Sequence, residues 1–350
     1  MMKKVFGVGL AVALTLGLPA CSSNQPSDTG TVTEVEVNNT SYTGPSYTLQ
    51  FGHAGAEGSL EDATSLKFKE LVEEKSGGKI QIDVFGNAQL GGLSDLVDAI
   101  RYGTVDIAIF AITDADSYYP KADLISLPYL FSDLDHVEAF YDSDLYAEMC
   151  DEFSEQTNCR EMGTFHAGFR CILSNREIHT ADDMKGLIIR VPEIQSYVST
   201  FGALGCNTIS LPASEVYQGL STGLIEATEA APSYMRTQNY QDQTDYCILS
   251  RHIYCGNSIF MSQSTLDGLD ASAVSLLQEA AQEAAEYARG IAEEEDAAAL
   301  QAFEDAGLTI IEPDRQTFQS AMDEVWDELI INRFDDGQEM IDAVLACDPG

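Results

Sequence analysis

The chain is poor in basic residues. It has 18 Lys and Arg against 57 Asp and Glu, which gives a formal net charge of -39. Phosphate backbones and anionic lipid surfaces repel such a chain, so the composition argues against a nucleic-acid-binding protein. The same scarcity makes any arginine inside an apolar, strand-like segment informative.

Motifs that carry enzyme chemistry are also missing. There is no Gly-x-Ser-x-Gly, no phosphate-binding loop and no metal-spaced histidine pair, and the five histidines are scattered. No Cys-x-x-Cys occurs, and the seven cysteines after Cys21 are an odd, dispersed set. Short bridges between Cys150 and Cys159, or between Cys247 and Cys255, stay open as alternatives. We therefore expect no enzyme, no cofactor and no metal site.

Long apolar runs are scarce, and the one near the start is too short to span a bilayer. It covers residues 5–18, follows Lys3 and Lys4 and is shorter than the ~20 residues that a membrane helix needs. This pattern predicts a signal peptide over residues 1–20. The sequence Leu-Pro-Ala-Cys at 18–21 resembles the lipobox of bacterial lipoproteins, which implies a lipidated Cys21. The alternative is a chance cysteine after an ordinary signal peptide.

Residues 21–45 are rich in Ser, Thr, Asn, Gly and Pro and lack apolar periodicity. Such a segment buries too little apolar surface to offset the entropy of ordering it, so we expect a flexible tether. A chain held this way would be extracytoplasmic and would contact the cell membrane only through its lipid anchor.

The next segment alternates strand and helix patterns. The expected elements are a strand at 47–51, a helix at 59–76, a strand at 80–84, a helix at 93–100 and a strand at 105–112. A β-α-β-α-β series predicts a mostly parallel sheet.

A second α/β pattern begins near residue 163. Strands are expected at 169–173 and 187–191, with Thr180 capping a helix between them and helical spacing over 197–204 and 216–224. A long helix is expected over 264–300, with a kink at Gly290. The last helix would place an apolar stripe in the core, made of Phe318, Met322, Val325, Trp326 and Leu329.

Four groups of residues in a fixed order resemble the DctP-type substrate-binding proteins of TRAP (tripartite ATP-independent periplasmic) transporters. The first is Phe-Gly-Asn-Ala-Gln-Leu-Gly-Gly at 85–92 with Gly-Thr-Val-Asp-Ile-Ala at 103–108. The second is Leu-Pro-Tyr-Leu-Phe at 127–131. The third joins 168–170, 175–176, 183–187 and 189–192, and the fourth joins 203–205, 214–217 and 220–223. The resemblance extends from about residue 47 to residue 308.

The resemblance implies an α/β fold of two lobes joined by crossing strands, with a ligand cleft between them and a long helix. Lobe I would comprise 46–167 plus 256–296, and lobe II 168–255 plus 297–350. Such proteins are not enzymes and pass a small organic acid to the membrane subunits of a TRAP transporter. We expect a monomer. A sensory lipoprotein that presents its ligand to a membrane receptor is the alternative, and an ABC-type system for a neutral or amino-acid ligand is a third.

Arg190 is the first candidate for ligand binding. It follows Ile188 and Ile189 at the end of an apolar strand, where an unpaired charge would be costly to bury. A ligand carboxylate would satisfy its planar guanidinium with two parallel hydrogen bonds. Arg170 is the second candidate and corresponds to an arginine that assists the carboxylate in many relatives. The alternatives are an internal acid as the partner of Arg190 and solvent around Arg170.

The resemblance suggests further contacts with the ligand. His53 and Glu57 lie where lobe I faces the cleft in relatives and would suit hydroxyl groups, and His166 has a similar standing. Ala230 replaces an asparagine that touches the carboxylate in many relatives, and Tyr234 is a candidate to compensate. The ligand class stays open among sugar acids such as uronates, keto acids and dicarboxylates, with a sugar acid favoured.

Overall fold

The structure, a computed structural model, describes residues 42–350. The predicted signal peptide, Cys21 and most of the predicted tether lie outside the described residues. The tether prediction is wrong at its end. The side chain of Tyr42 is buried, and its hydroxyl donates to the Pro45 carbonyl at 2.8 Å and to the Asp270 carboxylate at 3.1 Å. Tyr42 is therefore packed against the fold, whereas Thr43 and Pro45 are exposed.

The first sheet is mostly parallel, as the β-α-β-α-β pattern predicts. Its strand order is β2-β1-β3-β10-β4, and β1 pairs in parallel with both β2 and β3. The strands are β1 (Tyr47–Gly52), β2 (Ile80–Phe85), β3 (Ile107–Phe110), β4 (Cys159–Phe169) and β10 (Tyr254–Ser262). We call the part built on this sheet lobe I.

The second sheet has the strand order β11-β9-β5-β8-β6-β7. Its strands are β5 (Cys171–Ser174), β6 (Ile188–Val191), β7 (Asn207–Ser210), β8 (Ala227–Ala230), β9 (Tyr246–Ile248) and β11 (Thr309–Ile311). We call the part built on it lobe II. The two sheets confirm the predicted two-lobed α/β class, whereas the residue boundaries of the lobes stay a prediction.

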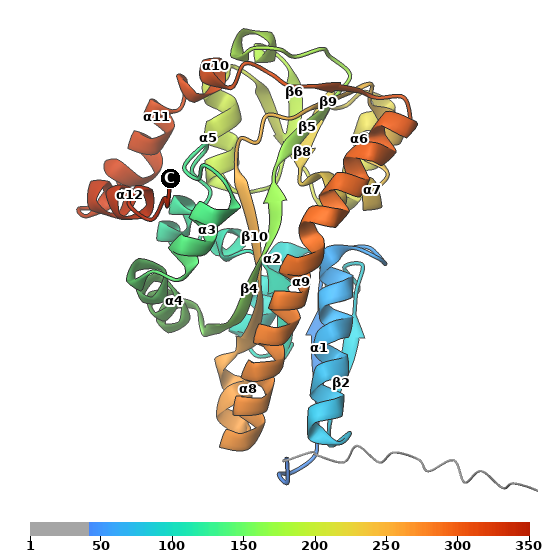
Figure 1. Ribbon diagram of the computed structural model, residues 1–350, viewed down its shortest axis with the longest axis vertical. Coiled ribbons are helices and arrows are strands. Elements are labelled where there is room, and N and C mark those ends of the chain that lie inside the picture. Colours follow the sequence, from blue (N-terminus) through green and yellow to red (C-terminus); the bar gives the residue numbers. More distant parts are fainter. Residues whose placement is uncertain (1–41) are drawn as a thin grey trace, which may run out of the picture. The chain divides into compact units, whose positions relative to one another are not determined.

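Two long antiparallel strands and one helix connect the lobes. β4 and β10 pair from Cys159 with Ser262 to Phe169 with Tyr254. β4 leads through Arg170 into β5, and residues 249–253 join β9 to β10. The helix α9 (Ala271–Asp305) contacts α1 (Leu60–Ser76) and β4 in lobe I and β11 in lobe II, and Figure 1 shows it spanning both lobes. It continues unbroken through Gly290.

The predicted helices of lobe I form with the expected ends. The Ser59 side chain accepts a hydrogen bond from the Asp62 backbone amide, and Gly77 ends the helix with a φ of 63°. The other α-helices are α2 (Leu93–Arg101), α3 (Leu134–Tyr141), α4 (Asp144–Thr157), α5 (Gln195–Ala203), α6 (Ala213–Thr222), α7 (Pro232–Thr237) and α8 (Gln263–Gly268). The 3-10 helices are η1 (Ile112–Ala115), η2 (Pro120–Leu124), η3 (Ala181–Met184) and η4 (Tyr240–Gln243).

Two helix predictions are wrong. Thr180 precedes only the single turn η3, because β6 begins four residues after that turn ends. The last predicted helix is split into α10 (Arg315–Gln319), α11 (Asp323–Trp326) and the π-helix η5 (Asp327–Ile331), and α12 (Gly337–Leu345) follows. Its apolar stripe is nevertheless packed: Phe318, Met322, Val325 and Leu329 are buried and Trp326 is partly buried.

The C-terminal segment also contacts lobe I. The Trp326 indole donates to the Pro128 carbonyl at 3.0 Å, and Arg333 forms an ion pair with the buried Asp123 at 2.9 Å. The His136 ring lies 2.8 Å from the Val344 carbonyl oxygen. The segment predicted for lobe II is therefore bonded to residues predicted for lobe I.

The seven cysteines of residues 42–350 form no disulfide, so neither local bridge left open by the sequence is present. Within these residues no cluster of His, Cys, Asp or Glu is arranged to hold a metal ion. None of the helices in residues 42–350 combines the length and apolar character needed to cross a membrane.

Candidate functional site

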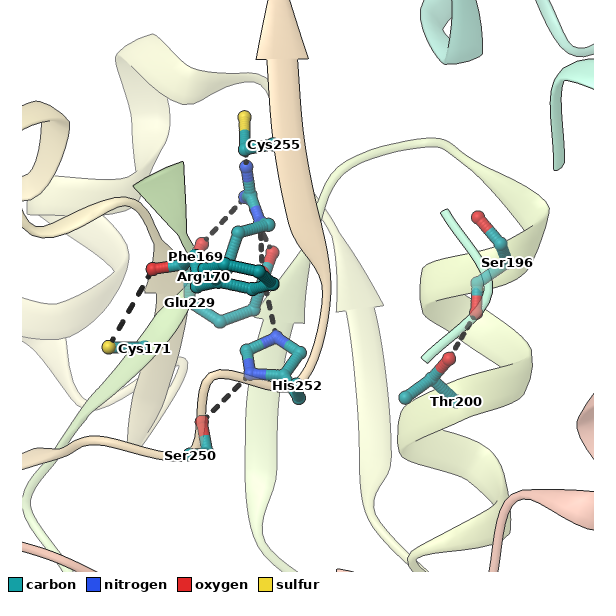
Figure 2. Close-up of polar contacts among 9 residues, drawn as sticks. All are labelled: Phe169, Arg170, Cys171, Ser196, Thr200, Glu229, Ser250, His252 and Cys255. Carbon is teal, nitrogen blue, oxygen red and sulfur yellow. Dashed lines mark hydrogen bonds and ion pairs between the residues drawn. The ribbon is translucent and has the colours of Figure 1, made fainter. Parts of the chain in front are cut away.

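Arg170 is bonded to an acid of the protein itself. It lies between β4 and β5, and its Nε donates to Glu229 Oε2 at 2.5 Å, while Nη2 donates to Glu229 Oε1 and to the Glu229 carbonyl, both at 3.0 Å (Figure 2). Its Nη1 lies 3.5 Å from Cys255 Sγ. Four of the five N–H donors of the guanidinium are thus engaged, and one remains.

Glu229 is fully buried on β8 and has a second partner, the buried His252. His252 Nε2 lies 3.3 Å from Glu229 Oε2, and its Nδ1 lies 2.8 Å from the Ser250 hydroxyl (Figure 2). Burial raises the pKa of Glu229, but Arg170 and His252 lower it by more than burial raises it, so the pKa of Glu229 is lowered overall. Burial lowers the pKa of His252, which leaves the ring neutral at pH 7. Glu229 therefore neutralises Arg170.

Arg190 lies on β6, the neighbour of β8, and has the opposite surroundings. Only 7% of the residue is exposed, and among residues 42–350 no Asp or Glu lies within ion-pair distance. Its Nε and Nη2 both donate to the Leu211 carbonyl, at 2.9 and 2.6 Å. Burial lowers the pKa of Arg190 even though the Glu229 charge raises it.

The two bonds to Leu211 leave one edge of Arg190 available. They use the Nε–H and one Nη2–H, so three of the five N–H groups remain, all at the end of the side chain. Among the described residues Nη1 has no hydrogen-bond partner. Two donors side by side on a fixed, planar group match the two oxygens of a carboxylate.

Two tyrosines of lobe II lie within electrostatic reach of Arg190. Burial raises the pKa of Tyr234 on α7, the charges of Tyr240 and Glu61 raise it further, and Arg190 and Arg170 lower it. Burial also raises the pKa of Tyr240, to about 12, against the same two arginines. Tyr234 thus lies within reach of the charges of both predicted arginines and of Glu61 of lobe I.

His53 directly follows β1 in lobe I. It is 1% exposed, and neither ring nitrogen has a hydrogen-bond partner in the described part of the chain. Asp62 Oδ1 lies 3.5 Å from Nε2, too far and too poorly aligned for a hydrogen bond. Burial lowers the pKa of His53, so a neutral ring with an unused donor and acceptor lies beside Glu61 and Asp62.

A cavity of about 20 Å³ adjoins Arg170. It is lined by Thr113, Tyr197, Cys255 and Gly256 among others, and the Arg170 guanidinium stacks 4.9 Å from the centre of the Tyr197 ring. This volume accommodates about one water molecule. A ligand the size of a sugar acid therefore enters only if the walls of this cavity separate.

Two predicted residues lie apart from this group. Glu57 is exposed and makes no side-chain hydrogen bond or ion pair with any described residue. His166 is buried on β4, where burial and the charge of Arg289 lower its pKa against the opposing charges of Glu138 and Glu293. Neither residue acts on the pKa of Arg190 or Arg170.

Several residues of the site were missed from the sequence, chiefly Glu229, His252, Glu61 and Asn257. The signal for Glu229 was present, since an acid in the buried strand Ala227–Ala230 needs a partner as much as a buried arginine does. His252 follows β9 with no comparable signal. Ala230, in place of the asparagine of many relatives, is buried opposite Cys171 and offers no side-chain donor.

Comparison with known proteins identifies the family. Residues 51–333 match the family described as "Bacterial extracellular solute-binding protein, family 7", named DctP. A solute-binding protein of Sulfitobacter sp. NAS-14.1 is 33% identical over 251 residues, which cover 71% of this chain and 76% of that protein. The C4-dicarboxylate-binding periplasmic protein DctP of Rhodobacter capsulatus is 28% identical over 290 residues, with 80% and 86% covered.

A solved structure shares the fold. The crystal structure of a TRAP periplasmic solute-binding protein from Roseobacter denitrificans with bound β-D-glucuronate is 25% identical. It superposes with a TM-score of 0.82 over 85% of this chain and 99% of that chain.

Proposed function

Because the chain belongs to bacterial extracellular solute-binding protein family 7, the DctP family of TRAP transporters, we propose that it captures a sugar acid or a related small organic carboxylate and delivers it to TRAP membrane subunits. Members of this family are extracytoplasmic substrate-binding proteins and not enzymes. The ligand and the transporter that receives it are the parts we propose.

One observation carries the proposal: Arg190 is a buried cation without an acidic partner among residues 42–350, held by Leu211 with three N–H groups free at its end. A buried charge that lacks a partner is costly, and a bound carboxylate would remove this cost while forming two charge-assisted hydrogen bonds. Such bonds contribute roughly 1.5–3 kcal/mol each, against the ~8 kcal/mol of micromolar affinity. Arg170, with one free donor, would add at most one direct bond.

The lobes would close over the ligand. We take lobe I as 46–167 plus 256–296 and lobe II as 168–255 plus 297–350, joined by β4, β10 and α9. In this arrangement Arg190, Arg170 and Tyr234 contact the ligand from lobe II, and His53 contacts it from lobe I. A change in lobe separation would admit a ligand that the cavity of about 20 Å³ does not hold.

A sugar acid fits the groups around Arg190. The unused donor and acceptor of His53 and the Tyr234 hydroxyl suit ligand hydroxyl groups. Relatives support this class, since the Roseobacter denitrificans protein binds β-D-glucuronate. Glu57 and His166 are proposed only as outer contacts, because no contact with a described residue directs either side chain toward Arg190.

The lipid anchor is a further part of the proposal and rests on the Leu-Pro-Ala-Cys sequence ending at Cys21. Metabolic labelling with palmitate should mark the wild-type protein and leave Cys21→Ser unlabelled. Equal labelling of both proteins would contradict the anchor. A sensory role would give the same result, so the partner that co-purifies after crosslinking, transporter subunit or receptor, separates the two roles.

A thermal-shift panel tests the ligand class. Purified protein is melted with uronates, aldonates, keto acids and C4-dicarboxylates, as wild type, Arg190→Ala and Arg160→Ala. Arg160 is an exposed arginine on β4 with no side-chain hydrogen bond to a described residue, and it serves as the matched control. A ligand at 100 times its dissociation constant stabilises the folded state by about 2.7 kcal/mol. We expect a sugar acid to raise the melting temperature of wild type and Arg160→Ala but not of Arg190→Ala. No shift with any acid, or an equal shift in Arg190→Ala, would contradict the proposal.

A further inference from the structure

The cleft has charge available for only one ligand carboxylate. Of its two arginines, Arg170 is neutralised by Glu229 through bonds of 2.5 and 3.0 Å, and four of its five donors are engaged. Arg190 alone lacks an acidic partner among the described residues. The residues that line the cavity beside Arg170 include no further Lys or Arg for a second ligand carboxylate.

The opposite wall is acidic. Glu61 and Asp62 lie in the first turn of α1, and no Lys or Arg of residues 42–350 forms an ion pair with either. Glu61 Oε1 accepts a hydrogen bond from Asn257 Nδ2 at 3.3 Å. The charge of Glu61 also raises the pKa of Cys255, whose Sγ lies 3.5 Å from Arg170 Nη1, and that of Tyr234. Glu61 therefore lies within electrostatic reach of residues that surround the arginines.

The polar groups around Glu61 do not offset its charge. His53 is buried, and because burial lowers its pKa the ring is neutral at pH 7. Asp62 Oδ2 accepts from the Gly58 backbone amide at 2.9 Å, and Asn257 is uncharged. The acids of this wall can accept hydrogen bonds from a ligand, but the wall has no positive charge that could bind an anion.

A third acid borders the same cavity. Asp114 Oδ2 accepts from the Ala111 backbone amide at 2.8 Å, and Ala111, Ile112 and Thr113 line the cavity. Burial raises the pKa of Asp114 to about 6, so the group is mostly ionised at pH 7.5. Glu61 and Asp114 thus add two carboxylates of the protein to the surroundings of Arg170 and Cys255.

We propose that this cleft selects acids that carry a single carboxylate and hydroxyl groups at the other end, and that Glu61 is the residue that rejects a second carboxylate. The inference rests on the proposed function, since it assumes that Arg190 takes the first carboxylate. Rejection follows from the cost of bringing a second anion, desolvated, against an ionised Glu61. Discrimination of this kind uses repulsion against the wrong ligand as well as contacts to the right one.

Matched pairs of linear sugar acids test the proposal by isothermal titration calorimetry at pH 7.5. D-gluconate and D-glucarate differ only at carbon 6, a hydroxymethyl group in one and a carboxylate in the other. L-galactonate and galactarate form a second pair, and D-glucuronate represents the uronates. For each pair whose monocarboxylate binds, we expect wild type to bind the monocarboxylate at least about 100-fold more tightly than the matched dicarboxylate.

Glu61→Gln keeps the size of the side chain and an oxygen that can accept the hydrogen bond from Asn257, and it removes the charge. It should reduce the discrimination ratio at least about tenfold, mainly by strengthening dicarboxylate binding. Glu74→Gln is the matched control, since Glu74 is an exposed acid near the other end of α1 and should leave the ratio unchanged. Asp114→Asn is a second variant that should also reduce the ratio, and it decides the question if Glu61→Gln does not fold.

The outcomes separate this inference from the proposed function. Dicarboxylates that bind wild type as tightly as their matched monocarboxylates would overturn the inference and leave the function standing. An unchanged ratio in a folded Glu61→Gln would overturn the role of Glu61. Absence of binding by every acid to wild type would overturn the proposed function and this inference together.

Discussion

Two regions of the lobe II sheet each hold an arginine, buried at Arg190 and partly buried at Arg170, and the two charges have different partners. Beside β5, Arg170 is bonded to Glu229 on β8, and His252 supports the acid. On β6, the other neighbour of β8, Arg190 has only the Leu211 carbonyl as a partner among the described residues. Only one strand separates the two arginines.

The difference indicates different roles. A charge that is paired within the protein makes a bonded network that fixes side-chain positions, and removing one partner leaves the other buried and uncompensated. A positioned charge without an acidic partner contributes little to folding but is ready to bind an anion. We therefore assign Arg170 mainly to the architecture of the cleft and Arg190 to ligand capture.

The largest expected effect on the free energy of unfolding comes from replacing Arg170 with an uncharged side chain of similar length. Arg170→Met leaves Glu229 buried without a cation, which should lower the free energy of unfolding by about 3–5 kcal/mol. Denaturant titration at pH 7.5 measures it. The double variant Arg170→Met with Glu229→Met should recover much of the loss, because buried pairs replaced by apolar side chains are often close to neutral. A loss below about 1 kcal/mol in Arg170→Met would mean that the pair is not the structural element described.

A smaller effect on stability is expected at Asp296, a partly buried acid of α9 whose pKa shifts in the opposite direction from that of Glu229. Arg170 and His252 outweigh burial and lower the pKa of Glu229, whereas burial raises the pKa of Asp296 to about 6 from the ordinary value of 3.8. The folded protein thus binds a proton at Asp296 more tightly than the unfolded chain does. The contribution of Asp296 to stability is present in full below about pH 4 and is lost as pH rises through 6.

Asp296→Asn should remove this dependence. Its free energy of unfolding should exceed that of wild type at pH 7.5 by on the order of 1 kcal/mol and approach it at pH 5. The Asn side chain retains an oxygen that can accept the hydrogen bond from the Ser233 backbone amide, 3.0 Å from Asp296 Oδ1 in the wild type. Denaturant titrations at both pH values measure the difference. Parallel pH profiles for the two proteins would contradict the upward shift at Asp296.

The smallest effect on the free energy of unfolding is expected from replacing Arg190. Arg190→Met removes two hydrogen bonds to Leu211 but also removes a buried charge that has no acidic partner in the described chain, and these changes oppose each other. Without added ligand, the free energy of unfolding should change by less than about 1 kcal/mol. The comparison fails if Arg190→Met destabilises the protein as strongly as Arg170→Met.

Much of the fold could be predicted from local patterns. The strands and helices of lobe I follow from apolar periodicity, and Ser59 and Gly77 mark the ends of a helix. The C-terminal helix was wrong because a continuous apolar stripe does not reveal where the backbone hydrogen bonds change. The stripe is packed, yet Phe318 lies in α10, Val325 and Trp326 lie in α11, and Leu329 lies in the π-helix η5 that continues directly from α11.

The site was predictable only in part. Arg190 stands out in the sequence because it lies in an apolar strand, where a charge without a partner is costly to bury. The partner of Arg170 does not stand out. The pairing of Arg170 with Glu229 depends on the strand order β5-β8-β6, which joins residues 59 positions apart in the sequence. Glu61 and Asn257 meet across 196 positions for the same reason. Pairings set by sheet order leave no local signal.

A crystal structure of the protein with bound D-glucuronate tests the central claim most directly. The account predicts that the two carboxylate oxygens lie about 2.7–2.9 Å from Nη1 and Nη2 of Arg190, with the Leu211 and Glu229 contacts retained and at most one bond to Arg170. A carboxylate that displaces Glu229 from Arg170, or that binds without touching Arg190, would contradict it.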